Sequence, residues 1–204
     1  MPTNTRSIRL ATATDAAAIA AIYAPYCRHT AVTFEVEPVS PVDMETRIQE
    51  LGERYPWVVM EQHGQLLGYA YAGPHHPRAA YRWAANVSVY VADSHHRTGV
   101  GRALYRSLFG LMWLQGFTQA VAGITLPNPA SVALHEDLGF RPVGIYKEIG
   151  HKLGAWRDVG WWQLPLGPLP DEPAKPLSTA QLVTLPGFAA ALATGTTDDG
   201  EYDN

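Results

Sequence analysis

Residues 86–104 constrain the fold of this chain more than any other segment. Residues 86–91 alternate between valine and other side chains, which is the period of a half-buried β-strand. From Val100 onward, apolar residues recur every three or four positions, which is the period of an amphipathic helix. The chain must therefore pass from strand to helix within a short turn. We expect the rest of the fold to be organised around this unit.

The turn itself has the features of an anion-binding site. Gly99 and Gly101 allow the backbone to approach a ligand closely, and the first N–H groups of the helix have no partners within it. The helix dipole places partial positive charge at the same point, and Arg97 and Arg102 add full charges. The segment therefore favours a phosphate ligand such as a pyrophosphate.

The common phosphate loops do not match this turn. The chain has no Gly-x4-Gly-Lys-Ser/Thr loop, and Leu104 stands where a dinucleotide fingerprint has its third glycine. The turn instead resembles the [Gln/Arg]-x-x-Gly-x-[Gly/Ala] loop of the GNAT family of N-acetyltransferases, with His96 at the Gln/Arg position. The matching residues are His96, Arg97, Thr98, Gly99, Val100 and Gly101.

Composition and charge narrow the class of protein. A chain of 204 residues that is 47% hydrophobic has room for one domain and a tail. The net charge of −4 and the lack of a Lys/Arg cluster argue against nucleic acid as a partner. Cys27 has no second cysteine to pair with, and the first residues lack the apolar core of a signal peptide. No apolar run approaches the ~20 residues of a membrane span, so we expect a cytoplasmic protein.

Periodicity and turn residues predict the other elements. Strands are expected at 7–11, 57–61, 66–72, 119–126, 143–152 and 157–164, and helices from Thr14, from Pro41 with a buried face reaching Tyr55, from Val100 to Gly116, and over 130–138. Prolines accumulate after 165 and the chain ends in acidic residues. We therefore interpret 167–204 as an appended tail, flexible or partly helical over 180–193.

Residues 6–165 resemble the phosphinothricin N-acetyltransferase group of the GNAT family. The motifs that carry the resemblance are Tyr55-Pro56-Trp57, Ala70-Tyr71-Ala72-Gly73-Pro74, Ser88-Val89-Tyr90-Val91, Leu126-Pro127-Asn128, His135-Glu136 and Gly154-Ala155-Trp156-Arg157-Asp158. The resemblance implies an α/β fold with a mixed central sheet, flanked by helices, whose fourth and fifth strands splay apart. The tail lies outside it.

The resemblance also implies a reaction and a set of ligands. Acetyl-CoA is the expected donor, the amine of a small amino-acid-like acid is the expected acceptor, and the protein is expected to be a homodimer. Val89, Tyr90, Val91 and Asn128 are then expected to contact the pantetheine arm, and His96 through Arg102 the pyrophosphate. Another small amine, such as a different amino acid or a polyamine, is an alternative acceptor.

One departure concerns the catalytic base. The family usually has a glutamate in the fourth strand where this chain has Asn86, and an amide cannot take up a proton. Three alternatives follow: the base lies elsewhere, the neutral fraction of the amine reacts, or the chain is a silent acyl-CoA-binding module. His135 is the best remaining titratable candidate, as either acid or base, and Glu35 is a weaker one.

A second departure concerns the acceptor site. Two arginines common in the family fall at His76 and Arg78, so only Arg78 keeps a permanent charge. We expect Arg78 and Tyr81 to bind the acidic group of the acceptor, with His76 and Phe34 in the same site. The histidine pairs at 75–76 and 95–96 lack the spacing of metal ligands, so we expect no metal.

Overall fold

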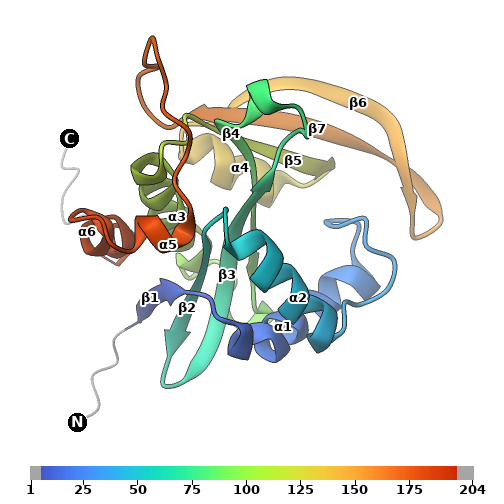
Figure 1. Ribbon diagram of the computed structural model, residues 1–204. Helices are drawn as coiled ribbons and strands as arrows, with labels where there is room; N and C mark the ends of the chain where they lie inside the picture. The colour runs from blue at the N-terminus through green and yellow to red at the C-terminus, as the bar shows by residue number, and fades with distance from the viewer. Residues whose placement is uncertain (1–5, 197–204) are drawn as a thin grey trace, which may run out of the picture.

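The computed structural model describes residues 6–196, which form one seven-stranded sheet with helices on both faces (Figure 1). The strands are β1 (Ser7–Leu10), β2 (Trp57–Gln62), β3 (Gln65–Pro74), β4 (Ala84–Val91), β5 (Gln119–Leu126), β6 (Arg141–Lys152) and β7 (Ala155–Pro165). The larger helices are α1 (Ala16–His29), α2 (Pro41–Gly52), α3 (Val100–Gln115) and α4 (Pro129–Asp137). Three 3-10 turns, η1 (Ala13–Asp15), η2 (Ala79–Tyr81) and η3 (Asp93–His95), join them.

The sheet is mixed, as the sequence predicts. Its strand order is β1-β2-β3-β4-β5-β7-β6, in which β4 and β5 run parallel and all other neighbours run antiparallel. β5 and Gly116, which ends α3, lie where the sequence places them, because a continuous apolar run and a left-handed glycine leave little alternative.

Strand β4 is covered on both faces. Its alternating side chains therefore face two different hydrophobic cores, not one core and the solvent. Ala85 and Val87 face α3, with its apolar residues Leu104 and Leu108. Tyr90 on the other face packs with residues of α1 and α2. Tyr90, which the alternation places opposite the valines, is buried, whereas Val89 and Val91 are only partly buried, so the pattern does not separate a buried valine face from an exposed one.

Helix α2 is shorter than its periodicity suggests. It ends at Gly52, and Tyr55 therefore lies outside it. The Tyr55 ring is buried on the α3 side of the sheet, where it stacks on Phe117 at 5.6 Å between centroids. The prediction that Tyr55 belongs to the buried face of α2 is corrected accordingly.

The chain beyond β7 returns along α3 and forms α5 (Thr179–Leu182) and α6 (Phe188–Ala193) (Figure 1). The fully buried Ser107 hydroxyl donates a hydrogen bond to the Leu192 carbonyl at 2.6 Å. A side chain on Gly110 would meet the Ala191 backbone at 3.1 Å, so α3 and α6 are in close contact. The acidic end that the sequence analysis singles out lies outside the described residues.

None of the helices within residues 6–196 combines the length and apolar character that a bilayer crossing requires.

The burial of Leu182 makes the C-terminal segment part of the core. Truncating Leu182→Ala should lower the free energy of unfolding by about 3 kcal/mol, because it leaves a cavity among core side chains. The neighbouring exposed residue is the matched control, and Val183→Ala should cost less than about 0.5 kcal/mol. Urea unfolding of the full chain measures both; equal small losses would contradict this packing.

Candidate active site

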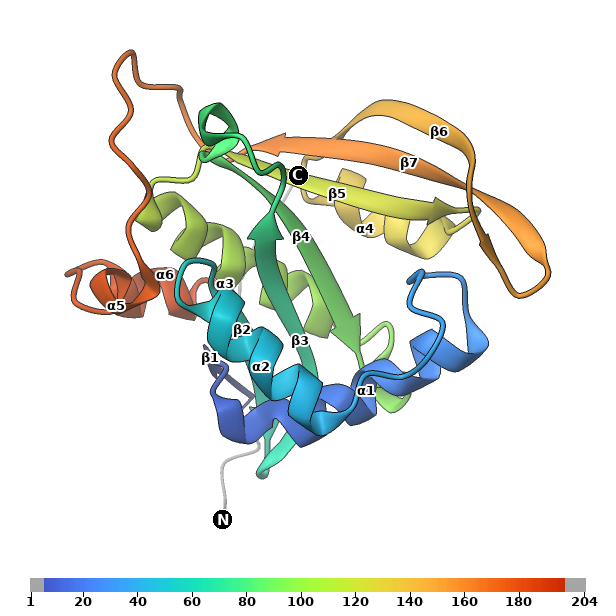
Figure 2. The same cartoon turned by 45° about the vertical axis from the view of Figure 1, so that its right-hand side comes forward.

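The parallel pair β4 and β5 parts soon after it begins. Ala84, Ala85 and Asn86 pair with β5, but no pairing continues beyond Asn86 although both strands run on (Figure 2). Backbone N–H and C=O groups that face such a gap need partners other than a neighbouring strand. The gap therefore suits an extended ligand with its own amide groups.

A cavity of about 50 Å³ lies in this gap. It is lined by Val87 through Tyr90 of β4, by Gly123 through Thr125 of β5, and by Asn128, Ser131 and His135 at the start and along α4. The Asn128 side-chain oxygen accepts a hydrogen bond from the Ser131 N–H at 3.2 Å and caps α4. The amide nitrogen of Asn128 remains available to a ligand. These residues fit the pantetheine arm of acetyl-CoA.

The turn before α3 provides the phosphate end of the site. Gly99 adopts a φ of 82° and Arg97 a φ of 60°, so the backbone follows a left-handed path into the helix. Arg97 has no charged partner among the described residues, whereas the half-buried Arg102 donates to Asp137 at 2.8 Å. The fit to a pyrophosphate rests on the first N–H groups of α3 and on Arg97.

His96 is hydrogen-bonded to α1 and to the end of β4. Its Nε2 lies 2.8 Å from the Tyr26 hydroxyl and 3.1 Å from the Val91 carbonyl oxygen. Because the carbonyl only accepts, Nε2 carries the hydrogen. That His96 contacts the cofactor stays a prediction; in the structure its ring links the end of β4 to α1.

His135 is buried and fully hydrogen-bonded. Its Nδ1–H donates to the Ser131 carbonyl at 2.7 Å, and its Nε2 accepts from the Tyr105 hydroxyl at 3.1 Å. Burial lowers the pKa of His135, so the ring is neutral at pH 7. A proton can reach Nε2 only after the bond to Tyr105 breaks, which makes His135 a poor base for the acceptor.

Asn86 is bonded to a histidine that the sequence analysis treats only as an unsuitable metal ligand. The His75 Nδ1 lies 2.9 Å from the Asn86 side-chain oxygen, and the Asn86 amide nitrogen donates to the Pro74 carbonyl at 3.3 Å. The antiparallel register of β3 and β4 brings the two together, since Gly73 pairs with Asn86. No local spacing signal predicts this contact.

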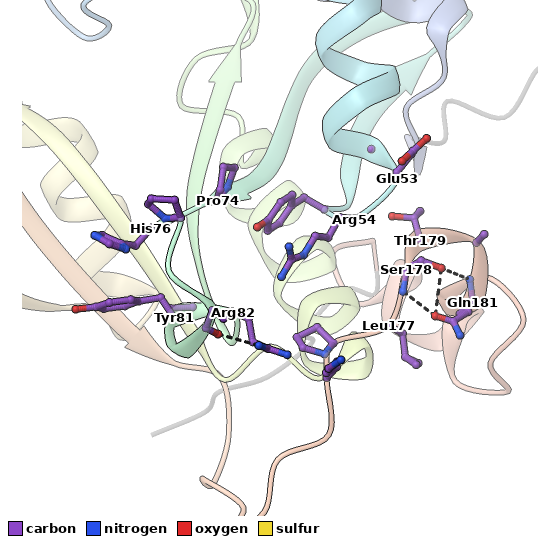
Figure 3. Close-up of a pocket in the computed structure, with 18 of the residues that line it drawn as sticks. Glu53, Arg54, Pro74, His76, Tyr81, Arg82, Leu177, Ser178, Thr179 and Gln181 are labelled. Carbon is purple, nitrogen blue, oxygen red and sulfur yellow. Dashed lines mark hydrogen bonds between the residues drawn. The ribbon is translucent and has the colours of Figure 1, made fainter.

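His76, Arg78 and Tyr81 line a separate cavity of about 1200 Å³. The His76 Nδ1 accepts from the Arg78 backbone N–H at 3.1 Å, and the His76 ring lies 4.5 Å from that of Tyr81. Figure 3 shows His76 and Tyr81 on one side and the C-terminal segment around Ser178 on the other. The C-terminal segment therefore forms one wall of this cavity, which no motif in the sequence predicts.

The loop after α1 lies at a different place from these acceptor residues. A side chain on Gly150 of β6 would collide with the Phe34 ring, so the loop and the β6–β7 hairpin are in close contact. Phe34 does not line the large cavity. Glu35 forms an ion pair with Arg47 at 2.7 Å, which occupies its carboxylate.

The same contact includes a buried lysine. Lys152 donates to the Thr33 carbonyl at 2.8 Å, and burial lowers the pKa of its ammonium group. Elsewhere within residues 6–196, no group of three or more His, Cys, Asp or Glu side chains is placed to hold a metal ion.

Comparison with known proteins agrees with this geometry. Residues 8–161 match the family model described as the acetyltransferase (GNAT) domain. A phosphinothricin N-acetyltransferase from Streptomyces viridochromogenes is 43% identical over 84% of this chain and 94% of its own. An L-methionine sulfoximine/L-methionine sulfone acetyltransferase from Salmonella typhimurium is 36% identical over 83% of this chain and 98% of its own.

Solved structures show the same likeness. A GNAT superfamily phosphinothricin acetyltransferase from Sinorhizobium meliloti, in complex with acetyl-CoA, superposes with a TM-score of 0.79 at 36% identity, over 84% of this chain and 94% of that one. The chain therefore belongs to the GNAT family of acetyltransferases. It is an acetyl-CoA-dependent N-acetyltransferase of the phosphinothricin N-acetyltransferase-like group.

The neutral state of buried His135 should give stability a pH dependence. The pKa of His135 is lowered in the folded chain, so the unfolded chain binds more protons as the pH falls. The stabilisation is complete above about pH 6.5 and is lost as the pH falls through the lowered value. Urea unfolding at pH 7.5 and pH 5 should therefore show a larger loss for the wild type than for His135→Asn. The exposed histidine variant His63→Asn should keep the wild-type loss, and an equal loss in all three proteins would contradict the assignment.

Proposed function

We propose that the chain transfers the acetyl group of acetyl-CoA to the amine of a small amino-acid-like acid of the phosphinothricin or methionine sulfoximine type. The observation that carries the proposal is the position of the cavity between β4 and β5, which begins next to a loop that presents Arg78. The names of the relatives support this acceptor class. Acetyl-CoA supplies an activated thioester carbonyl when bound.

Different residues along β4 bind different parts of acetyl-CoA. The backbone groups of residues 87–91 that face away from β3, toward β5, have no strand partner and can bind the amide groups of the pantetheine arm and donate an N–H to the carbonyl oxygen as it gains charge. The first turn of α3 and Arg97 bind the pyrophosphate at the far end of the strand. The donor is thereby held along one edge of the sheet.

The loop before β4 binds the acceptor. The Arg78 guanidinium has no acidic partner among the described residues, and its fork matches a carboxylate or phosphinate. Because His76 Nδ1 accepts a backbone hydrogen bond, its Nε2 carries a hydrogen even when the ring is neutral. The acid group of the acceptor then has a cation, an N–H donor and the Tyr81 hydroxyl within one loop.

Activity should depend on Arg78. Free CoA release from acetyl-CoA is measured with phosphinothricin, methionine sulfoximine, common amino acids and a polyamine, over pH 6 to 9. Turnover with an acidic amine is expected, and Arg78→Gln should raise KM for the acids about tenfold or more, because one charge-assisted pair is lost. The polyamine reaction should not change in this variant.

The control is Arg28→Gln, an exposed arginine in the last turn of α1, which should leave kcat/KM unchanged. A preference for the polyamine would assign a different acceptor. If no acceptor in the panel releases CoA although acetyl-CoA still binds, the result would favour a catalytically silent acyl-CoA-binding module.

We also propose that the protein works in the cytoplasm as a homodimer. The β6–β7 hairpin carries large apolar side chains that are 50% to 65% exposed in the single chain: Val143, Ile145, Tyr146, Ile149, Leu153 and Trp156. Such a concentration is unusual on a monomer and is typical of a protein interface. Sedimentation should give twice the chain mass, and Ile149→Lys should shift the protein toward the monomer; a monomeric wild type would contradict this proposal.

A further inference from the structure

The contact between His75 and Asn86 fixes the protonation pattern of His75. The Asn86 amide nitrogen donates to the Pro74 carbonyl, so the amide oxygen is the atom that faces His75. This oxygen only accepts, and the His75 Nδ1 must therefore carry the hydrogen of the 2.9 Å bond. In the neutral ring, Nε2 then holds a lone pair, and it has no hydrogen bond to any described residue.

The His75 ring lies beside the point where β4 and β5 separate. Asn86 is the last residue of β4 that pairs with β5, and the next residue, Val87, already lines the cavity between the two strands. The half-buried His75 ring lies 5.9 Å from the Tyr81 ring and 6.4 Å from the Trp161 ring. Residues from both sides of the gap thus surround the imidazole at the point where β4 and β5 separate, which is called the fork below.

The surroundings of His75 carry little charge. The side chains in contact with it are Tyr81 of η2, Trp161 of β7 and Asn86 of β4, none of which is an acidic carboxylate or a basic amine. Along its own loop the titratable or charged neighbours are His76 and Arg78. No carboxylate among the described residues is bonded to the ring, so a proton taken up by Nε2 has no strong counter-ion to trap it.

The other titratable groups near the gap are not available to accept a proton from the acceptor. Both ring nitrogens of His135 are hydrogen-bonded, and the Glu35 carboxylate is paired with Arg47. Burial raises the pKa of the Tyr90 hydroxyl, which removes it as a base at neutral pH. His76 has the opposite tautomer and presents an N–H. Among the described residues at this fork, His75 is the group with an open basic nitrogen.

We propose that His75 is the general base of acetyl transfer and that Asn86 is a positioning residue that holds its tautomer. The inference rests on the proposed function. The acceptor ammonium gives one proton to His75 Nε2, directly or through one water, and the freed nitrogen lone pair attacks the thioester carbonyl carbon. The C–N bond forms and the C–S bond breaks. The second proton of the nitrogen ends on the CoA sulfur, and His75 returns its proton to solvent.

Replacing the base tests the proposal by kinetics. With the acceptor that the wild type uses best, His75→Gln should lower kcat about 10²-fold with little change in KM, and it should remove the imidazole limb of the pH profile at low pH. Added imidazole should restore part of the activity of His75→Ala. The double variant His75→Gln, Asn86→Glu should regain turnover with the limb moved to lower pH, because a carboxylate then serves as the base.

The surface variant His63→Asn is the control and should match the wild type. Wild-type kcat and an unchanged pH profile in His75→Gln would overturn the proposal. So would a His75→Ala enzyme that imidazole does not restore, since a loss without rescue indicates a structural role.

A second measurement does not need an acceptor. Nitrogen-15 NMR of histidine-labelled protein, with CoA bound and without it, should show His75 as the Nδ1–H tautomer. Asn86→Leu should abolish that preference, whereas the control His63→Asn should keep it. An Nε2–H tautomer in the wild type would overturn the proposal even if no acceptor in the panel reacts, and it would do so without bearing on the proposed function.

Discussion

The parting of β4 and β5 is the constraint on which the rest of the structure depends. Two parallel strands that separate after Asn86 leave backbone groups that a continuous sheet would satisfy internally. The sheet can tolerate this because α3 and α4 cover one face and α1 covers the other. The gap therefore offers backbone hydrogen-bonding groups along its length, and the side chains Arg97 and Arg78 lie near its opposite ends.

Histidine protonation around this gap is set by the main chain and by one amide. Ser131 and the Arg78 N–H fix the tautomers of His135 and His76, and Asn86 fixes that of His75. In their neutral forms the two adjacent histidines therefore have opposite tautomers, and Nε2 presents a lone pair in His75 and an N–H in His76. A single loop can then interact with both the ammonium and the acid group of an amino-acid-like molecule.

Much of the fold could be predicted because local signals were strong. Asn128 followed by proline caps α4, and Gly116 ends α3 in a left-handed conformation, so both boundaries follow from local chemistry. The position of Tyr55 could not be predicted, because helical spacing continues past Gly52 although the helix ends there. The pairing of His75 with Asn86 depends on the β3–β4 register, which local sequence does not encode.

Lys152 has a consequence for how the two substrates reach each other. Its ammonium group donates to the Thr33 carbonyl in the loop after α1, and Gly150 of β6 lies against the Phe34 ring of the same loop. Lifting the β6–β7 hairpin would break both contacts, so they tie the hairpin to this loop. In the proposed arrangement, the long nucleotide-bearing molecule and the small acid therefore approach the gap from opposite ends of β4.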